Sequence, residues 1–349
     1  MPRIIRRVTI QDIADACSLS RVTVSKVFNG RGEVPISTKM RVLQKAREMG
    51  YLTSENQVET PDPSNQKSIA LFTRNLPREY HFGAAMLSSS TDILSRAGYT
   101  MSMFEVSDEE IRQRILPTRF SAEKTAAILV IELFDPEYLK MICSAGLPVV
   151  VIDSPAYAVT ESMRCDYVLM ENTSSITALV RHLYDSGARR MGFVGDRVHC
   201  GSFYERWSAF ASALSVLGME YDEDNCLLEP DDSPYSDPRW IEEKLRAMPV
   251  LPDALVCAND YLAVNILAAL KRMGKTVPSD VMVTGFDGSR QSELVEPSIT
   301  TVRIPGAEIG RVAANIIMTR IHGSELPHIL TYIKTEPEFR ASTDKQITV

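Results

Sequence analysis

The stretch that decides the fold of the N-terminal part is VTIQDIADACSLSRVTVSKVFNG, residues 8–30. Apolar residues recur at helical spacing on both sides of a break at residues 18–20. Thr9 and Asp12 have the spacing of a capping box at the start of a first helix of roughly two turns. Ser20 is placed to cap a second helix, whose apolar face consists of Val24, Val27 and Phe28. We therefore expect two short helices that meet across a tight turn.

A third helix is expected over residues 37–50. The segment 29–32, Asn-Gly-Arg-Gly, ends the second helix, and Ser37 or Thr38 can open the next one. Gly50 is placed as its C-terminal stop. Its inward residues are expected to be Val42, Leu43, Ala46 and Met49. The three helices together predict one small helical core.

The side chains that remain outside this core at the start of the second helix are Arg21, Val22, Ser25 and Lys26. This is the end that a helix-turn-helix presents to base edges. An Arg side chain can pair with guanine, and a Val side chain can contact the methyl group of thymine. Thr23, Ser25 and Lys26 can serve base edges or phosphates. Because exposed charges occur on any helical bundle, the helix pattern alone leaves DNA binding open.

The charge distribution separates the N-terminal part from the rest of the chain. The sequence of 349 residues has a net charge of −7, but residues 1–52 carry ten Lys and Arg against four Asp and Glu. That segment therefore has a charge of +6, and the remainder has a charge of −13. A basic module on an acidic body is typical of a DNA-binding head attached to a domain that does not bind DNA.

The N-terminal sequence closely resembles the helix-turn-helix of the lac-repressor (LacI/GalR) family. The resemblance is carried by residues 8–14 and 19–30, and it continues at Val34, Thr38, Lys39 and Gly50-Tyr51. It implies that Arg21 and Val22 occupy the two principal specificity positions, with Lys26 as a third contact. The residues expected to contact DNA are Thr9, Ser20, Arg21, Val22, Thr23, Ser25, Lys26 and Asn29. The implied partner is double-stranded, near-palindromic operator DNA, read by a homodimer or a higher oligomer because one head offers only a small interface.

Residues 53–66 form a polar, proline-bearing segment without an apolar period, which predicts a linker. Members of the family usually carry a hinge helix here, with an Ala-Arg-x-Leu element whose leucine inserts into the minor groove. The Arg position falls on Val58 and the Leu position on Thr60. Thr60 is a poor apolar wedge, and phosphates would repel the acidic residues of the segment. We therefore expect a weaker dependence on minor-groove kinking than is usual in the family.

From Lys67 onward, short apolar runs alternate with helix-like stretches such as Gly83–Arg96 and Thr173–Asp185. The runs that predict buried parallel strands are Ser68–Phe72, Tyr99–Phe104, Ala126–Ile131, Pro148–Ile152, Tyr167–Leu169, Met191–Val194, Ala254–Cys257 and Val281–Phe286. Two sets of about five strands predict an α/β fold with two doubly wound lobes, in which ligands sit beyond the carboxyl ends of the strands. The expected ligand site is the cleft between the lobes.

The resemblance to the family extends over this body, and with it over nearly the whole chain. It is carried by Cys257–Ala263, Gly285–Gly288, Pro297–Val302, Glu308–Gly310 and Glu336–Thr343. It implies the fold of periplasmic sugar-binding proteins, in which the chain crosses three times between the lobes. The expected ranges are 1–52 for the helix-turn-helix domain, 67–343 for the effector-binding domain, 67–169 with 302–331 for its N-lobe, and 170–301 with 332–343 for its C-lobe.

The same resemblance implies a set of effector-binding side chains. They are His81, Phe82, Arg206, Asn259, Asp260 and Asp287. Arg206 matches a family arginine whose planar fork can hold adjacent hydroxyls or a carboxylate. Asp287 matches an acid that accepts hydrogen bonds from hydroxyl or amine groups of the ligand. A milder interpretation makes Asp260 a helix cap, Asp287 part of a turn and His81 a solvated loop residue.

A sugar or sugar derivative is the expected effector, and neither a cofactor nor a metal ion is expected. In the C-lobe, the position at which the family often supplies a stacking aromatic falls near residues 231–235, Asp-Asp-Ser-Pro-Tyr. A carboxylate or a shifted Tyr235 at that position would alter what the cleft can hold.

Several other classes of protein fit the sequence less well. No apolar run approaches the roughly 20 residues of a membrane span, and the N-terminus lacks the apolar region of a secretory signal, so a cytoplasmic protein is expected. A soluble sugar-binding transport protein of the periplasmic type is the alternative, but it leaves the helix-turn-helix unexplained. An enzyme is not expected, because the sequence has no Gly-rich phosphate loop, nucleophile elbow or metal cluster.

The six cysteines are far apart and contain no Cys-x-x-Cys pair, which predicts reduced and mostly buried thiols. Cys200 is expected near the ligand cleft, where a reactive role is the alternative to simple packing.

Overall fold

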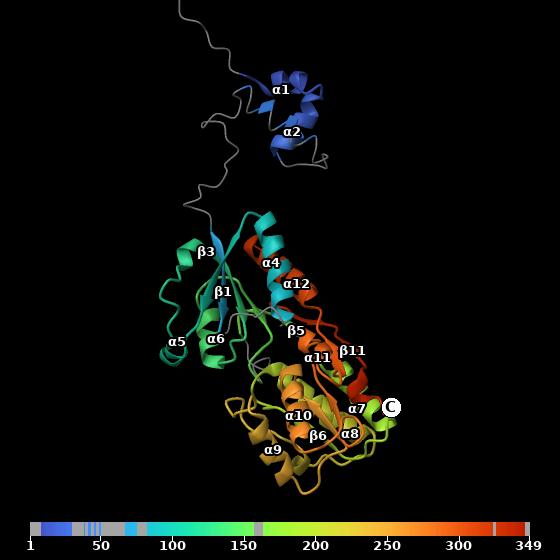
Figure 1. Cartoon of the computed structure of the whole chain (residues 1–349). Helices are drawn as coiled ribbons and strands as arrows, with labels where there is room; N and C mark the ends of the chain where they lie inside the picture. Colours follow the sequence, from blue (N-terminus) through green and yellow to red (C-terminus); the bar gives the residue numbers. More distant parts are fainter. Residues whose placement is uncertain are drawn as a thin grey trace, which may run out of the picture. The chain divides into compact units, whose positions relative to one another are not determined.

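The computed structural model describes residues 8–29, 38, 41–42, 45–46, 49, 67–74, 82–156, 163–323 and 326–345, and for Phe28, Asn29 and Phe82 it describes the backbone alone. The chain divides into two compact units, residues 1–66 and 67–349, which we call the head and the body. Figure 1 draws both units with their helices and strands. The expected linker at 53–66, with Val58 and Thr60, lies outside the described residues, and so does His81.

The helices of the head with described bounds are α1 (Ile10–Ala16) and α2 (Arg21–Asn29). The predicted capping box is confirmed, because the backbone N–H of Thr9 donates to Asp12 Oδ2 at 2.7 Å and that of Asp12 donates to Thr9 Oγ1 at 3.3 Å. Ser18 has a φ of 53°, in the left-handed region, and reverses the chain between the helices. Ser20 then caps α2, since its Oγ accepts the N–H of Thr23 at 3.0 Å.

The head has one small apolar core, as predicted. Its buried residues are Ile13, Ala14, Cys17, Val24, Val27, Val42 and Ala46. In the expected third helix, the described residues Thr38, Arg41–Val42 and Lys45–Ala46 are helical, and Met49 packs partly buried against the core. Leu43 lies outside the described residues. The inward face predicted for this helix is therefore confirmed at Val42, Ala46 and Met49.

The first lobe of the body, the N-lobe, is built around a parallel sheet. Its strands are β1 (Ser68–Thr73), β2 (Thr100–Glu105), β3 (Thr125–Ile131), β4 (Val149–Ile152), β5 (Asp166–Met170) and β10 (Leu330–Ile333). Its helices are α4 (Phe82–Arg96), α5 (Asp108–Gln113), α6 (Pro136–Cys143) and α12 (Gly306–Ile321). The strand order is β10-β5-β4-β3-β1-β2, with every neighbouring pair parallel.

Helices cover both faces of this sheet, which explains why its central strands are apolar without alternation. Ile69 and Leu71 of β1 belong to a cluster with residues of α4 and α12, whereas Ala70 and Phe72 belong to a cluster with residues of α6. Helices α4 and α12 pack against each other, as Figure 1 shows. The sheet is therefore a rigid platform whose strand ends hold the loops that follow them.

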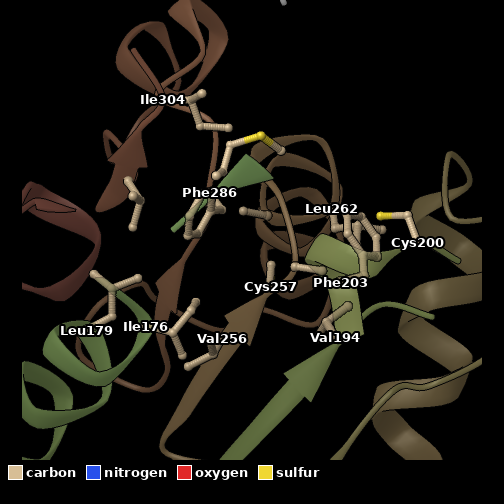
Figure 2. Packing of buried hydrophobic residues seen from close by; sticks show 14 of the residues in the cluster. Ile176, Leu179, Val194, Cys200, Phe203, Val256, Cys257, Leu262, Phe286 and Ile304 are labelled. Carbon is tan, nitrogen blue, oxygen red and sulfur yellow. The ribbon is translucent and has the colours of Figure 1, made fainter. Parts of the chain in front are cut away.

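The second lobe, the C-lobe, contains a shorter parallel sheet in the order β6-β7-β8. Its strands are β6 (Met191–Val194), β7 (Ala254–Cys257) and β8 (Met282–Thr284), and its helices are α7 (Thr173–Asp185), α8 (Gly201–Val216), α9 (Pro238–Ala247), α10 (Asp260–Arg272) and α11 (Arg290–Leu294). Single bridges at Leu227 and Thr300 extend the sheet on either side. Figure 2 shows part of the core, where Val194 and Val256 from the sheet and Ile176 and Leu179 from α7 lie among the buried residues.

The described chain passes between the lobes where β5 leads into α7, where β9 (Thr301–Arg303) leads into α12, and where β10 leads into β11 (Glu336–Glu338). Strands β9 and β11 pair antiparallel, with Val302 opposite Pro337. Arg303 reinforces this pairing, because its guanidinium forms ion pairs with Glu336 and, at 3.0 Å, with Glu338. Two of the crossings are thus held together as a small ladder.

All eight predicted strands form, each within two residues of its predicted bounds. The apolar runs of the sequence do not predict strands β9, β10 and β11. Strand β10 lies at the edge of its sheet and alternates exposed with half-buried residues, so it has no apolar run to find. The described part of the body also has single-turn 3-10 helices at Ala122–Lys124, Glu223–Asn225 and Ala341–Thr343.

Candidate DNA-reading helix and ligand cleft

The outward side chains at the start of α2 form a surface suited to reading DNA. Arg21, Val22 and Lys26 are exposed, and Thr23 and Ser25 are half-buried beside them. Val22 is 64% exposed, although Val24 and Val27 of the same helix are buried. An exposed aliphatic side chain at the start of such a helix fits contact with a thymine methyl group.

Three further residues of the predicted DNA-contacting set lie at the ends of helices α1 and α2. Thr9 and Ser20 are exposed and use their side-chain oxygens to cap α1 and α2. Asn29 ends α2, and its side chain lies outside the described residues. Contact of the whole set with DNA stays a prediction.

A cavity of about 780 Å³ lies between the two lobes of the body. Ligand pockets of proteins commonly have volumes of roughly 300–1,000 Å³. The lining residues are Arg74, Ile111, Glu132, Leu133, Phe134 and Asp135 from the N-lobe and Asp196, His199, Pro230, Asp231 and Asp232 from the C-lobe. Arg74, Glu132 and Asp196 follow strands β1, β3 and β6 within two residues. The cavity thus lies at the carboxyl ends of the strands, where this fold places ligands.

Aromatic rings from both lobes meet at this cavity. The ring of Phe134, from the N-lobe, has its centroid 5.1 Å from that of the His199 imidazole, from the C-lobe. His199 lies equally close to Phe203, and its Nδ1 is 3.3 Å from Asp231 Oδ2. Sequence reasoning misses Phe134 and His199, because no motif marks them. Their one signal is a place in a loop that follows a predicted strand.

The loop after β4 ties the two lobes together beside the cavity. The backbone N–H of Gly201, at the start of α8, donates to the Ser154 carbonyl at 2.7 Å. The N–H of Ser202 donates to Asp153 Oδ1 at 3.2 Å, and the Ser202 hydroxyl donates to the other oxygen of that carboxylate. A Cβ on Gly201 would lie 2.2 Å from Ser154 Oγ and 3.2 Å from the Ser154 carbonyl oxygen, so any larger residue would force Ser154 to move.

Arg206, on α8, is buried beneath the cleft with 2% of its surface exposed. Its Nε donates to Asn172 Oδ1 at 2.9 Å, and its Nη1 donates to the Ala258 carbonyl at 2.7 Å. The guanidinium carbon lies 3.6 Å from the centre of the Phe286 ring. Nη1 is also 3.6 Å from Asp287 Oδ1. Arg206 therefore joins α7, β7 and the loop after β8, in addition to any contact with a ligand.

Asp287 follows β8 and sits in a strongly charged environment. Its side chain is 12% exposed. Burial raises the pKa of its carboxyl group to about 8, against the opposing effect of the Arg206 charge, and Asp260, Glu132 and Asp153 add to the rise. Burial, with the charge of Asp153, also raises the pKa of Glu132.

The structure gives Asn259 and Asp260 roles in the fold. Asn259 is the N-cap of α10, and its Oδ1 accepts the N–H of Leu262 at 2.9 Å. Asp260 is 1% exposed, and its carboxylate accepts the Thr301 hydroxyl at 2.5 Å and the Ser289 N–H at 2.7 Å. Both oxygens of Asp260 are thus engaged inside the protein, where they support the loop after β8. A contact of Asp260 with a ligand stays a prediction.

The segment 231–235 contributes carboxylates rather than an aromatic ring. Asp231 and Asp232 line the cavity. Tyr235 is 4% exposed, and its hydroxyl donates to the Glu229 carbonyl at 2.9 Å, so it belongs to the core. Phe82 begins α4, but its side chain lies outside the described residues, as does all of His81.

Cys200 is buried, as predicted for a packing thiol. It is 3% exposed, and burial raises the pKa of its thiol well above the ordinary value. Figure 2 shows it beside Phe203 and Leu262. A thiol that is both inaccessible and held protonated is a poor nucleophile.

Two features are absent from the described parts of the chain. There, no helix combines the length and the apolar character that crossing a membrane requires. Within the same residues, no group of three or more His, Cys, Asp and Glu side chains is arranged to hold a metal ion.

Comparison with known proteins explains this combination of a head and a two-lobed body. Residues 9–54 match the bacterial regulatory proteins of the lacI family, and residues 180–343 match the periplasmic binding protein-like domain. The chain belongs to the lacI family. This lacI-family protein is 27% identical to the HTH-type transcriptional regulator CelR of Thermobifida fusca, over 97% of its own length and 98% of the relative's. It is 25% identical to the HTH-type transcriptional repressor PurR of Aliivibrio salmonicida, over 90% and 92% of the two lengths.

Solved structures agree with these relatives in fold. A complex of the transcriptional regulator CelR with cellobiose superimposes with a TM-score of 0.70 at 24% identity, covering 96% of this chain and all of the other. A lac repressor dimer bound to operator and an anti-inducer gives a TM-score of 0.67 at 18% identity, covering 97% and 99%. The lacI-family protein described here is a DNA-binding transcriptional regulator and not an enzyme.

Proposed function

We propose that this regulator acts in the cytoplasm as a homodimer. Its two heads bind near-palindromic operator DNA, and the bound protein represses transcription. A small polyhydroxylated effector, a sugar or sugar derivative, binds in the cavity between the lobes and sets the affinity for the operator. The observation that carries the proposal is the cavity itself, placed at the strand ends of both lobes in a chain that also has an exposed recognition helix. The solved complex of CelR with cellobiose supports the choice of ligand class.

On the DNA side, we assign base reading to Arg21 and Val22 and further contacts to Lys26, Thr23 and Ser25. These side chains lie on the exposed or half-exposed surface at the start of α2. Two half-sites, read by two heads related by a twofold axis, would supply the specificity that one short helix cannot.

On the effector side, we assign ligand contacts to Asp287, His199 and Phe134, with Arg206 as the buried base of the site. When the lobes close on the ligand, the hydrogen bonds between the loop after β4 and the start of α8 would become either weaker or stronger. A ligand shifts such an equilibrium only by its differential affinity for the two arrangements.

The test has two steps. The operator is first selected from random double-stranded DNA, and the stoichiometry of the complex is measured by analytical ultracentrifugation; two chains per palindromic site are expected. A panel of sugars is then screened for a rise in melting temperature, since a ligand that binds only the folded state stabilises it by mass action. A ligand that raises the melting temperature should also change operator affinity, and failure to select any DNA motif would overturn the proposal.

A further inference from the structure

We propose that the effector carries a positively charged amino group, as an amino sugar does, and is not a neutral sugar, a sugar acid or a sugar phosphate. This inference rests on the function proposed above, because it concerns the same cavity. The carboxyl groups that line the cavity determine which ligand charge the site accepts.

The lining of the cavity has an excess of acidic groups. Its carboxyl groups belong to Glu132, Asp135, Asp196, Asp231 and Asp232. The basic groups of the described lining are Arg74 and His199, and both face carboxylates of the protein. Arg74 lies 2.7 Å from Asp108, and His199 lies 3.3 Å from Asp231. The described lining is therefore negative, and an anionic ligand would be repelled from it.

At the starts of α6 and α8, backbone N–H groups that could bind an anion already have carboxylate acceptors within the protein. Asp135 caps α6, where its Oδ1 accepts the N–H of Tyr138 at 2.7 Å. Asp153 takes the same kind of place at the start of α8, through the N–H of Ser202. Helix N-termini are the usual sites for phosphate or carboxylate groups of ligands. At α6 and α8 the protein's own carboxylates fill such sites.

The same holds for the loop after β6. The Oδ1 of Asp196 accepts the N–H of Val198 at 2.9 Å, and its Oδ2 accepts the N–H of Asp231 at 3.0 Å. The N–H groups of Val198 and Asp231 thus already have a carboxylate of the protein as their acceptor. A phosphate on a ligand would have to displace Asp196 to reach them.

Arg206, which the sequence alone would assign to a carboxylate or to hydroxyls, is committed within the protein. It is 2% exposed, and it donates to Asn172 and to the Ala258 carbonyl. Its flat face lies on Phe286. A ligand carboxylate therefore cannot pair with Arg206, and Arg74, the arginine of the described lining, is already paired with Asp108.

A ligand cation, by contrast, meets favourable groups from both lobes. Glu132 lines the cavity, and Asp287 lies close enough to Glu132 for the two charges to interact. Both groups have a raised pKa because they are buried near other carboxyl groups, and a cation between the lobes would stabilise their ionised forms. Phe134 adds an aromatic ring at the same cavity, and aromatic faces attract ammonium groups. Hydroxyl groups of the same ligand can donate to the remaining carboxylate oxygens.

The experiment compares ligands of one shape and different charge. Binding of D-glucosamine, D-glucose, N-acetyl-D-glucosamine and D-gluconate is measured by calorimetry on the full chain at pH 6.5, with the galacto and manno series beside them. We expect the amine of one series to bind at least about tenfold more tightly than the matching neutral sugar, which corresponds to ~1.4 kcal/mol. The N-acetyl form keeps the nitrogen but lacks the charge, so it should bind like the neutral sugar or more weakly.

Two variants locate the effect. Asp232→Asn removes one negative charge from the lining at an exposed position, and it should reduce the preference for the amine severalfold without changing the melting temperature of the free protein. Glu243→Gln makes the matching change at an exposed position of α9 outside the lining, and it should leave the preference unchanged.

The outcomes separate this inference from the proposed function. A neutral or anionic sugar that binds as tightly as its amine overturns the inference and leaves the proposed function standing. Failure of every member of the panel to bind overturns the sugar assignment and the inference together. An amine preference that survives in Asp232→Asn as fully as in Glu243→Gln would show that the charge is read elsewhere, and it would overturn the assignment to this lining.

Discussion

The recognition surface of the head and the cleft of the body use opposite chemistry and opposite burial. The start of α2 exposes Arg21 and Lys26 on a segment with a charge of +6, whereas the cavity between the lobes gathers carboxyl groups and the body buries Arg206 beneath it. A side chain on the head needs only the right position on one helix. A side chain in the cleft is held by several elements at once. Substitutions on the head should therefore change recognition alone, whereas substitutions in the cleft should change folding as well.

Replacing Arg206 with Ala should have the largest effect and should act on stability. The change leaves Asn172 Oδ1 and the Ala258 carbonyl without their donor, and it removes the guanidinium that lies 3.6 Å from Asp287 Oδ1. Leaving a buried acceptor without its hydrogen-bond donor costs about 1–3 kcal/mol for each acceptor. Urea unfolding followed by tryptophan fluorescence measures this directly, because both tryptophans, Trp207 and Trp240, belong to the body.

The control for this variant is Arg112→Ala, which removes an exposed arginine that pairs with Glu109 three residues away. Surface pairs of this kind contribute little, so the control should unfold like the wild type. If Arg206→Ala also kept wild-type stability and lost only the response to ligand, Arg206 would act in recognition alone, as the side chains of the head do. The contrast between the two regions would then fail.

On the head, Arg21→Ala should cost ~1–3 kcal/mol at one base pair and relax the preference there. Arg21 is exposed, so the melting temperature should not change. Lys26→Ala is the matched change on the same helix: if Lys26 contacts a phosphate, the loss should be nearly uniform across sequences, with a shallower salt dependence. Selection from random DNA distinguishes the two, and an identical motif for Arg21→Ala and wild type would refute the assignment.

The cleft should also respond to pH in a way that the head does not. Asp287 faces Arg206 from α8, Asp260 from α10, and Glu132 and Asp153 from the loops after β3 and β4, and its pKa is raised to about 8. Below pH 8 the free protein therefore holds this carboxyl group mostly protonated, while a bound ammonium group favours the ionised form. Binding releases a proton, so affinity for an amine should rise with pH between about 6 and 7.5, by up to tenfold per pH unit or ~1.4 kcal/mol.

Calorimetry of an amino sugar in buffers of different ionisation enthalpy measures this proton release. The Asp287→Asn variant lacks the group whose pKa is raised to about 8, and its affinity should depend less on pH over the same range. Proton uptake on binding, or an unchanged pH profile in Asp287→Asn, would assign the titration to another group.

The smallest effect is expected in the linker, which joins the two regions. Thr60 stands at the position where the family usually has an intercalating leucine, and Thr60→Ala should change operator affinity by less than ~1 kcal/mol. Losing a true wedge would cost a few kcal/mol. A large loss, with footprinting that protects the central base pairs, would show that a hinge reads DNA together with the head.

By itself, the sequence determined what depends on neighbours along the chain. The capping box of Thr9 and Asp12, the cap at Ser20 and the exposed position of Val22 follow from spacing along a helix, and all of them are found in the structure. The buried strands can be predicted for the same reason. A parallel strand that is covered on both faces is apolar along its whole length, so its own sequence identifies it.

Only the tertiary structure decided how residues from distant loops share the cleft. Asp260 looks like a ligand contact in the sequence, but the fold brings Thr301 and Ser289 onto its carboxylate. Phe134 and His199 lie 65 positions apart and carry no motif, yet the two lobes place their rings 5.1 Å from each other. Contacts of this kind depend on how parallel strands align at one edge and how two lobes face each other, and no local pattern in the sequence encodes that geometry.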